Sequence, residues 1–238
     1  MIKFDGVGLN LKAGKLRTHI LDDVTVTLPS DRTLILLGGH GSGKSTIIKL
    51  IAGLLLPDEG RISRMARVSY PVGYTGGFVP QLTARRNIVH AAELYDADPD
   101  EVVSFVAQVT EMGSALDEPI AHLPPKFRTY FGYALSYALP FDVYLVDTNL
   151  SIGDQAFREK CSAMFGERIR SAGAIIATRN PRIARRYGNC AAIIHDRQII
   201  MYDDFETALG DFERTHLTEQ AAQNLGAADD SAQESADS

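Results

Sequence analysis

The chain has 238 residues, of which 45% are hydrophobic, so it is long enough to bury the core of roughly one or two domains. Its formal net charge of -6 excludes the basic surface typical of a nucleic-acid-binding protein. The first residues, MIKFDGVGLNLK, lack the pattern of a signal peptide, and the most apolar stretch, residues 47–56, is interrupted by Lys49. We therefore expect any membrane role to come through a partner.

In chain order, strand-like segments alternate with helix-like segments. Apolar or alternating runs predict strands at residues 24–28, 33–37, from 61, 143–147, 174–178, 191–195 and 198–202. Helical spacing of apolar residues predicts helices at residues 45–55, 84–95, 99–112, 127–138, 155–171 and 181–187. Apolar strands separated by helices predict a largely parallel sheet with helices on both faces. The helix-only stretch at approximately residues 80–140 indicates an inserted helical subdomain.

The end of the chain differs in composition from the rest. After Arg214 there is no Lys or Arg, and five acids carry five of the six net negative charges: Glu219, Asp229, Asp230, Glu234 and Asp237. Such a small, polar, acidic segment cannot bury enough apolar surface to become ordered by itself. We therefore predict a folded domain over residues 1–213 and a disordered acidic tail over residues 214–238.

Residues 38–45 read GGHGSGKS and match the phosphate-loop pattern G-x-x-x-x-G-K-[ST], with a predicted strand before it and a helix after it. The glycines let the backbone wrap around phosphate groups, and the start of the helix adds positive potential. Lys44 is expected to reach the β- and γ-phosphates, and Ser45 to hold Mg²⁺. The predicted nucleotide-binding residues are Gly38, Gly39, His40 (as a spacer), Gly41, Ser42, Gly43, Lys44, Ser45 and Thr46.

Asp147 is the second predicted ligand of Mg²⁺. It follows four apolar residues in VYLVD, so it should emerge at the carboxyl end of a buried strand, where ligands bind in parallel sheets. The alternative interpretation is an Asp that only caps a strand. Together with the phosphate loop, Asp147 predicts ATP and Mg²⁺ as the cofactors.

The segment GGHGSGKSTIIKLIAGLLLPDEGRI resembles the ATP-binding subunits of ABC transporters. VSYPVGYTGGFVPQLTARRNI, GYALSYALPFDVYLVD and SIGDQAFREKC are similar to the exporters of capsular and related polysaccharides, and the resemblance runs from Met1 to about Glu213. It implies an α/β P-loop NTPase with a mainly parallel sheet flanked by helices, an antiparallel β N-terminal part and an inserted helical subdomain. It also implies a head-to-tail dimer at the cytoplasmic face of the inner membrane. The helical insert and the loop before it would dock onto a permease.

The chain departs from this family at the residues of hydrolysis. Thr148 stands where the family has its catalytic glutamate, and Arg179 stands at the switch histidine. A hydroxyl is a poor base for the attacking water, whereas an arginine can pair with a γ-phosphate but cannot transfer a proton. We therefore expect ATP binding and dimer closure to matter more than turnover.

Three further positions depart from the family pattern. The signature segment falls on residues 123–127, LPPKF, in which two prolines remove backbone donors and no hydroxyl remains. The adenine-stacking aromatic aligns with Leu11. Gln81 is the only local candidate for the glutamine loop, although Val79 lies nearest the expected place. By contrast, Asp154 lies in the segment SIGD, which resembles the loop that crosses the dimer interface in this family.

Three functions fit these residues. The first is an ATP-binding subunit that powers or gates a permease exporting a polysaccharide. The second is a regulatory or scaffold protein that holds ATP without transport. The third, a P-loop small-molecule kinase, is disfavoured by the Pro-Asp-x-Gly segment after the first long helix. The remaining basic cluster, Arg182, Arg185 and Arg186 beside Arg179, is interpreted as a solvated helix face.

Overall fold

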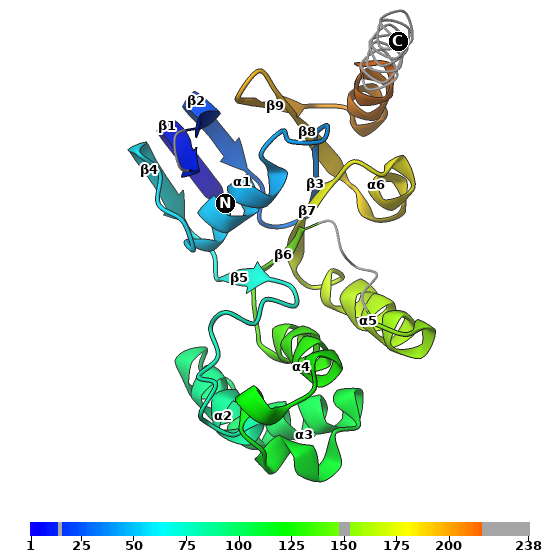
Figure 1. Ribbon diagram of the computed structural model, residues 1–238. Coiled ribbons are helices and arrows are strands. Elements are labelled where there is room, and N and C mark those ends of the chain that lie inside the picture. Colours follow the sequence, from blue (N-terminus) through cyan, green and yellow to red (C-terminus); the bar gives the residue numbers. More distant parts are fainter. Residues whose placement is uncertain (14–15, 148–152, 216–238) are drawn as a thin grey trace, which may run out of the picture.

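The computed structural model describes residues 1–13, 16–147 and 153–215, and its strands form two sheets (Figure 1). The smaller, antiparallel sheet has the order β2-β1-β4, with β1 at Ile2–Ala13, β2 at Leu16–Leu28 and β4 at Glu59–Arg64. The larger sheet has the order β5-β6-β7-β3-β8-β9. Its strands are Val68–Pro71, Val143–Asp147, Gly173–Thr178, Thr33–Leu37, Cys190–His195 and Gln198–Tyr202. Its first five strands are parallel, and β9 pairs antiparallel with β8.

The central strand β3 separates two hydrophobic cores. All five of its residues are buried, and successive side chains point to opposite faces of the sheet. Leu34 and Leu36 pack into the core shared with the antiparallel sheet, whereas Ile35 and Leu37 pack into the core shared with the helices of the opposite face. This burial on both faces explains why β3 reads as a continuous apolar run.

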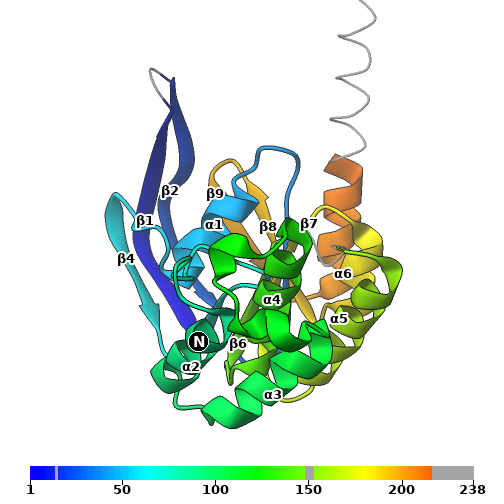
Figure 2. The ribbon, with the colours of Figure 1, turned by 60° about the horizontal axis from the view of Figure 1, so that its bottom comes forward.

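Helix α1 (Lys44–Ala52) lies between the two sheets (Figure 2). It ends at Gly53, whose left-handed conformation (φ 76°) suits a residue without Cβ. Arg64 of β4 donates hydrogen bonds to the carbonyls of Leu50 (2.6 Å) and Ile51 (2.7 Å). The antiparallel sheet therefore supplies donors to two carbonyls in the last turn of the helix, where intrahelical partners are fewest.

A helical part lies between β5 and β6 in the chain and projects from the edge of the larger sheet (Figure 1). It comprises α2 (Ala84–Leu94), α3 (Pro99–Thr110), the short helices η1 (Gly113–Asp117) and η2 (Ile120–His122), and α4 (Pro125–Ala138). Side chains cap the first two helices, since Thr83 accepts from Arg86 N and Asp98 accepts from Asp100 N.

The remaining helices follow the later strands. Helix α5 (Gln155–Arg168) precedes β7, and α6 (Pro181–Tyr187) follows it. Residues 205–215 are also helical and lie beside α6, where Glu213 forms an ion pair with Arg185 (3.2 Å) (Figure 2).

The predicted fold class is confirmed: a mainly parallel sheet carries helices, and an antiparallel sheet lies at the N-terminal side. Strands β1 and β5 and the helix over residues 205–215 were not among the predicted elements. In β1, Gly6, Gly8 and shifts in its pairing register interrupt the simple alternation that marks a strand. Within the described part of the chain, no helix is long and apolar enough to cross a membrane.

Candidate functional site

The loop of residues 38–43 connects β3 to α1 and wraps tightly. Gly43 has φ 88°, a left-handed conformation, and a Cβ at this position would lie 2.7 Å from Ile20 Cγ2. Both facts demand glycine here, because a side chain would be strained and would collide with β2. The N-cap residue of α1 is Gly43 itself, which has no side chain that could cap the helix. The amides of its first turn are therefore left for an external acceptor.

Lys44 is folded back onto the loop that precedes it. Its Nζ donates hydrogen bonds to Gly38 O (2.8 Å), Gly39 O (2.5 Å) and Ser42 Oγ (3.2 Å). Burial lowers the pKa of Lys44, the nearby charge of Arg179 lowers it further, and Asp147 acts in the opposite direction. The ammonium group is thus held half-buried by neutral oxygens, which a phosphate can replace with charged ones.

Three neighbouring strands bring the charged residues to one edge of the sheet. The registers pair Leu37 with Thr178 and Asp147 with Ala177, so the ends of β3, β7 and β6 lie side by side. Arg179 follows β7 and is exposed. A cavity of about 450 Å³ opens there, lined by Ile20, His40, Gly41, Ser42, Gly43, Lys44, Ser45, Thr46 and Arg179.

These residues fit a nucleotide with Mg²⁺. Two cations, Lys44 and Arg179, face one cavity at the uncapped start of a helix, and this arrangement suits a polyphosphate. Ser45 is exposed at the cavity and Asp147 is half-buried nearby. Among the described residues no group of three His, Cys, Asp or Glu side chains could hold a metal by itself. Mg²⁺ is bound by one or two protein ligands together with phosphates, so Ser45 and Asp147 are sufficient as its protein ligands.

The apolar wall of this cavity comes from a residue that sequence analysis missed. Ile20 of β2 lines it and also belongs to the core beneath the antiparallel sheet, against which Leu11 packs. Leu11 is not among the residues that line this cavity. The alternation that predicted a strand at residues 24–28 also includes Ile20, but Asp22 and Asp23 interrupt it. In the structure Asp23 has φ 47°, so the strand is locally irregular at this point but continues on both sides of it.

The remaining predicted residues, His40, Gln81 and Thr148, differ in their outcome. His40 is exposed and lines the cavity, as its place in the loop requires. Gln81 is exposed in the segment before α2 and is not among the residues that line the cavity. Thr148 lies outside the described residues.

The segment aligned with the family signature begins α4. Pro124 and Pro125 occupy the cap and the first position of the helix, where a missing N–H is tolerated. Lys126 donates to Asp154 Oδ2 (2.9 Å), and the Tyr130 hydroxyl donates to the same oxygen (2.8 Å). Tyr130 also stacks on Phe157, with ring centroids 3.6 Å apart and an interplanar angle of 6°. The start of α4 and the start of α5 are therefore clamped together.

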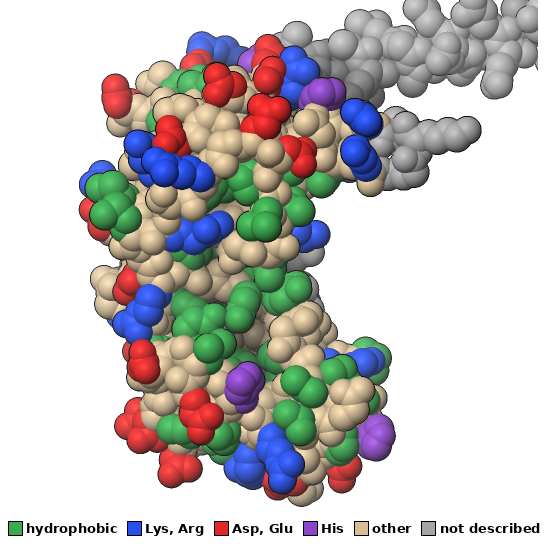
Figure 3. All heavy atoms as spheres, turned by 90° about the vertical axis from the view of Figure 1, so that its left-hand side faces the viewer, with side chains coloured by type: hydrophobic (Ala, Val, Ile, Leu, Met, Phe, Trp, Pro, Cys, Tyr) green, Lys and Arg blue, Asp and Glu red, His purple; other side chains and the backbone are tan. Residues whose placement is uncertain are grey.

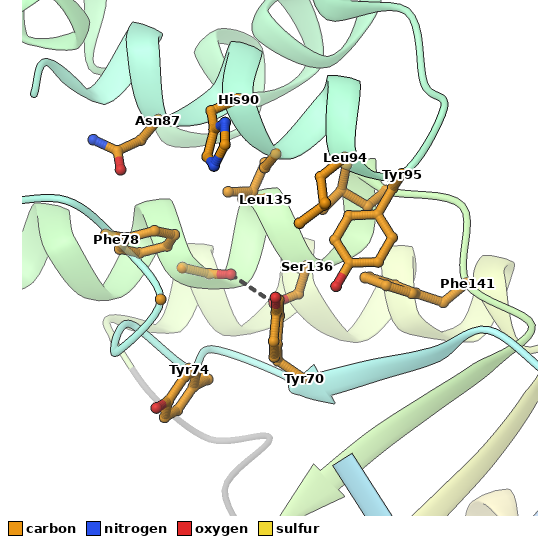
Figure 4. A pocket seen from close by; sticks show the side chains of 14 residues that line it. Tyr70, Tyr74, Phe78, Asn87, His90, Leu94, Tyr95, Leu135, Ser136 and Phe141 are labelled. Atoms are coloured by element: carbon orange, nitrogen blue, oxygen red, sulfur yellow. Dashed lines mark hydrogen bonds between the residues drawn. The ribbon is translucent and has the colours of Figure 1, made fainter. Parts of the chain in front are cut away.

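A second cavity, of about 240 Å³, lies between the helical part and the segment after β5. Tyr70 comes from β5 itself, Tyr74 from the segment after it, His90 and Leu94 from α2, and Leu135 from α4 (Figure 4). Leu94 lines the cavity although its side chain is 61% exposed. Hydrophobic side chains gather in a hollow on this side of the molecule (Figure 3).

The chain is similar to a known family of proteins. The family model described as ABC transporter matches residues 21–126. The polysialic acid transport ATP-binding protein KpsT of Escherichia coli is 30% identical over 216 residues, which is 90% of this chain and 96% of the relative. The ATP-binding protein BexA of Haemophilus influenzae is 30% identical over 196 residues, which is 82% of this chain and 90% of the relative.

Solved structures share the fold. One, an ATP-binding subunit of an ABC transporter, has a TM-score of 0.70 at 21% identity and covers 88% of this chain and 93% of its own. Another, the dimeric ATP-binding cassette MJ0796 bound to ADP and Pi, has a TM-score of 0.67 at 17% identity. It covers 84% of this chain and 96% of its own.

Proposed function

This chain belongs to the ATP-binding subunits of ABC transporters, and on that premise we propose that it powers or gates a permease that exports a polysaccharide. Dimer closure on ATP and Mg²⁺ would drive the permease, and hydrolysis would be slow. The substrate class rests on the relatives: one is named for polysialic acid transport, and a 29% identical protein of Neisseria meningitidis is named for capsule polysaccharide export. Attachment through the permease would place the chain at the cytoplasmic face of the inner membrane.

The observation that carries ATP binding is the placement of Lys44 and Arg179 at one cavity. Lys44 would exchange its loop oxygens at 2.5–3.2 Å for phosphate oxygens without leaving the loop. Arg179 would approach from the end of β7 and present its planar group to the terminal phosphate. Ser45 and Asp147 would hold Mg²⁺, which neutralises charge on the phosphates when it is bound.

Slow hydrolysis is proposed from the groups that are missing. At the position of the catalytic glutamate Thr148 offers a hydroxyl, which is a weak proton acceptor. The start of α4, which would face the partner's nucleotide, carries two prolines and therefore lacks two backbone donors. Loss of a base or of a positioned donor each costs about 10²–10³ in rate, so the combined losses favour binding over turnover.

The second cavity supports the docking of a permease segment. It is lined by aromatic and apolar side chains, and both Leu94 (61% exposed) and Val79 (41% exposed) present apolar surface beside it. Asn87, which is buried, bonds both the N–H (2.8 Å) and the carbonyl (3.1 Å) of Val79. The loop before α2 is thereby held against the helical part, which gives a partner one preformed surface.

Single-turnover phosphate release tests the proposal on hydrolysis. Thr148→Glu should raise the rate on the order of tenfold or more, because it supplies the missing proton acceptor. Thr148→Gln is the matched control, since it has the same size without the carboxylate, and it should leave the rate unchanged. Brisk release by the unaltered protein that Lys44→Ala abolishes would refute slow hydrolysis.

ATP binding itself needs a separate measurement. Titration with a fluorescent ATP analogue and Mg²⁺ should give a saturable signal that Lys44→Ala removes. A linear, unsaturable signal in the unaltered protein would contradict the nucleotide site.

A further inference from the structure

Three arginines line an open groove between α5 and α6. Arg158 comes from α5, and Arg182 and Arg186 come from α6. The groove has a volume of about 740 Å³, within the ~300–1,000 Å³ of typical binding clefts. It lies outside the nucleotide cavity, because the two share none of their lining residues.

Neutral groups hold two of these arginines in place. Arg186 donates to Ser162 Oγ (3.1 Å) and lies 5.1 Å from the centre of the Tyr187 ring. Arg158 donates to the carbonyl of Gly153 (2.9 Å). A guanidinium has five donor hydrogens, so both keep donors for another acceptor.

The groove carries an excess of positive charge. None of its three arginines forms an ion pair with a carboxylate anywhere in residues 1–13, 16–147 and 153–215. Its single acid, Glu159, accepts a hydrogen bond from the Gln155 amide (2.9 Å) instead. Guanidinium groups pair well with carboxylates, so a segment with several carboxylates suits this groove.

The chain itself has such a segment, and it starts close to the groove. The helix over residues 205–215 already contacts α6 through the two-pronged pair of Glu213 with Arg185 (3.2 and 3.5 Å). Arg186 is the next residue of α6. The 23 residues from 216 to 238 follow Glu213 almost directly, and they contain the five acids but no Lys or Arg. Fully extended they reach about 75 Å, far more than the groove requires.

We propose that the acidic tail of residues 216–238 binds in the basic groove of its own chain, through carboxylate contacts to Arg158, Arg182 and Arg186. Each exposed pair is weak and screened by salt, so the contact depends on several carboxylates acting together. The covalent link between the tail and the domain offsets this weakness, because a short linker keeps the tail at an effective concentration on the order of millimolar. The contact is therefore intramolecular and falls with ionic strength.

Carbodiimide cross-linking of the full chain tests whether the tail lies in the groove between α5 and α6. Arg182→Lys places an amine in the groove, where it can be coupled to a tail carboxylate and identified by mass spectrometry. The matched control is Arg170→Lys, an exposed position after α5 that does not line the groove. We expect a cross-link to the tail several-fold more abundant at position 182. Raising the salt from about 0.1 M to about 1 M, which shortens the Debye length from ~10 Å to ~3 Å, should remove it. Equal yields at both positions would overturn the proposal.

A mixture of heavy- and light-isotope chains decides whether the contact is within one chain. Cross-links that join only peptides of one isotope are expected, whereas mixed pairs would show that the tail occupies a second copy and would contradict the intramolecular contact. Backbone ¹⁵N relaxation of the tail gives an independent readout. Its amides should gain mobility when the five acids are replaced by their amides (Glu→Gln, Asp→Asn), a change outside the described residues. Unchanged relaxation would also overturn the proposal.

Discussion

Lys126, in the first turn of α4, donates a hydrogen bond to the Asp154 carboxylate at 2.9 Å. The other oxygen of Asp154 accepts from the backbone of Phe157 (3.0 Å) and so caps α5. One carboxylate therefore joins the start of the helix aligned with the family signature to the start of α5. If the start of one helix moves, the start of the other must move with it, because otherwise the Asp154 carboxylate loses one of its hydrogen bonds.

Because Asp154 is titratable, this clamp makes the stability of the folded protein depend on pH. The hydrogen bond from Lys126, the helix N–H of Phe157 and the hydroxyl of Tyr130 lower the pKa of Asp154 below its ordinary 3.8. Because the folded pKa is depressed, the stabilisation is complete above the ordinary value and is lost as pH falls through the folded value. Asp154→Asn should lower the melting temperature at about pH 7 and weaken its acid dependence. Thermal melts against pH, with Glu167→Gln on the same helix as control, check this; an unchanged acid dependence would count against the clamp.

Arg179 is expected to sense the terminal phosphate. It lines the loop cavity beside Lys44, and a charge-assisted hydrogen bond contributes about 1.5–3 kcal/mol, or roughly 10- to 100-fold in affinity. Arg179→Ala should therefore weaken ATP binding by about tenfold or more and ADP binding much less. Calorimetric titration with both nucleotides measures the difference. Arg182→Ala, which removes the same charge three residues later, should affect neither, and an equal loss for ATP and ADP would argue against a γ-phosphate contact.

Asn87 should be a structural requirement of the loop before α2. It is 5% exposed, and its amide group bonds the N–H and carbonyl of Val79 together with the carbonyls of Leu82 (3.3 Å) and Thr83 (3.0 Å). Asn87→Ala leaves the part-buried Val79 N–H without its partner and removes one of two donors from each of the three carbonyls, so it should cost about 1–3 kcal/mol of unfolding free energy. Urea denaturation gives the value. His90→Ala, on the exposed side of the same helix, should cost far less, and equal costs would show that the network contributes little.

Leu94 provides the test of permease docking. Its side chain is 61% exposed and lines the aromatic cavity, so Leu94→Lys should place a charge in the contact without unfolding the protein. We expect the variant to co-sediment several-fold less with membranes of cells that produce the permease of this transporter. Leu56→Lys is the matched control, because Leu56 is 78% exposed but lies between α1 and β4. Equal retention of both variants would place the permease elsewhere.

Much of the fold and the centre of the site could be predicted from local patterns. The predicted bounds of β3, β6, α6 and β9 agree with the structure, because each is a short apolar or periodic run ended by a turn residue or a charge. The phosphate loop was equally predictable, since its glycines and lysine act through their own backbone and spacing. Helix α1 ends at Ala52 rather than at residue 55 because Gly53 takes a left-handed conformation.

Contacts between distant segments were decided only by the tertiary structure. The sequence alone determined that a lysine and an arginine follow two buried strands, and that five acids close the chain. Folding decided that these strands are neighbours, so that Arg179 and Lys44 line one cavity, and that Ile20 forms part of its wall. It also brought Lys126 to Asp154 across 28 residues. Local patterns report the conformation of a few neighbouring residues, whereas strand order and helix packing depend on which apolar faces cover one another.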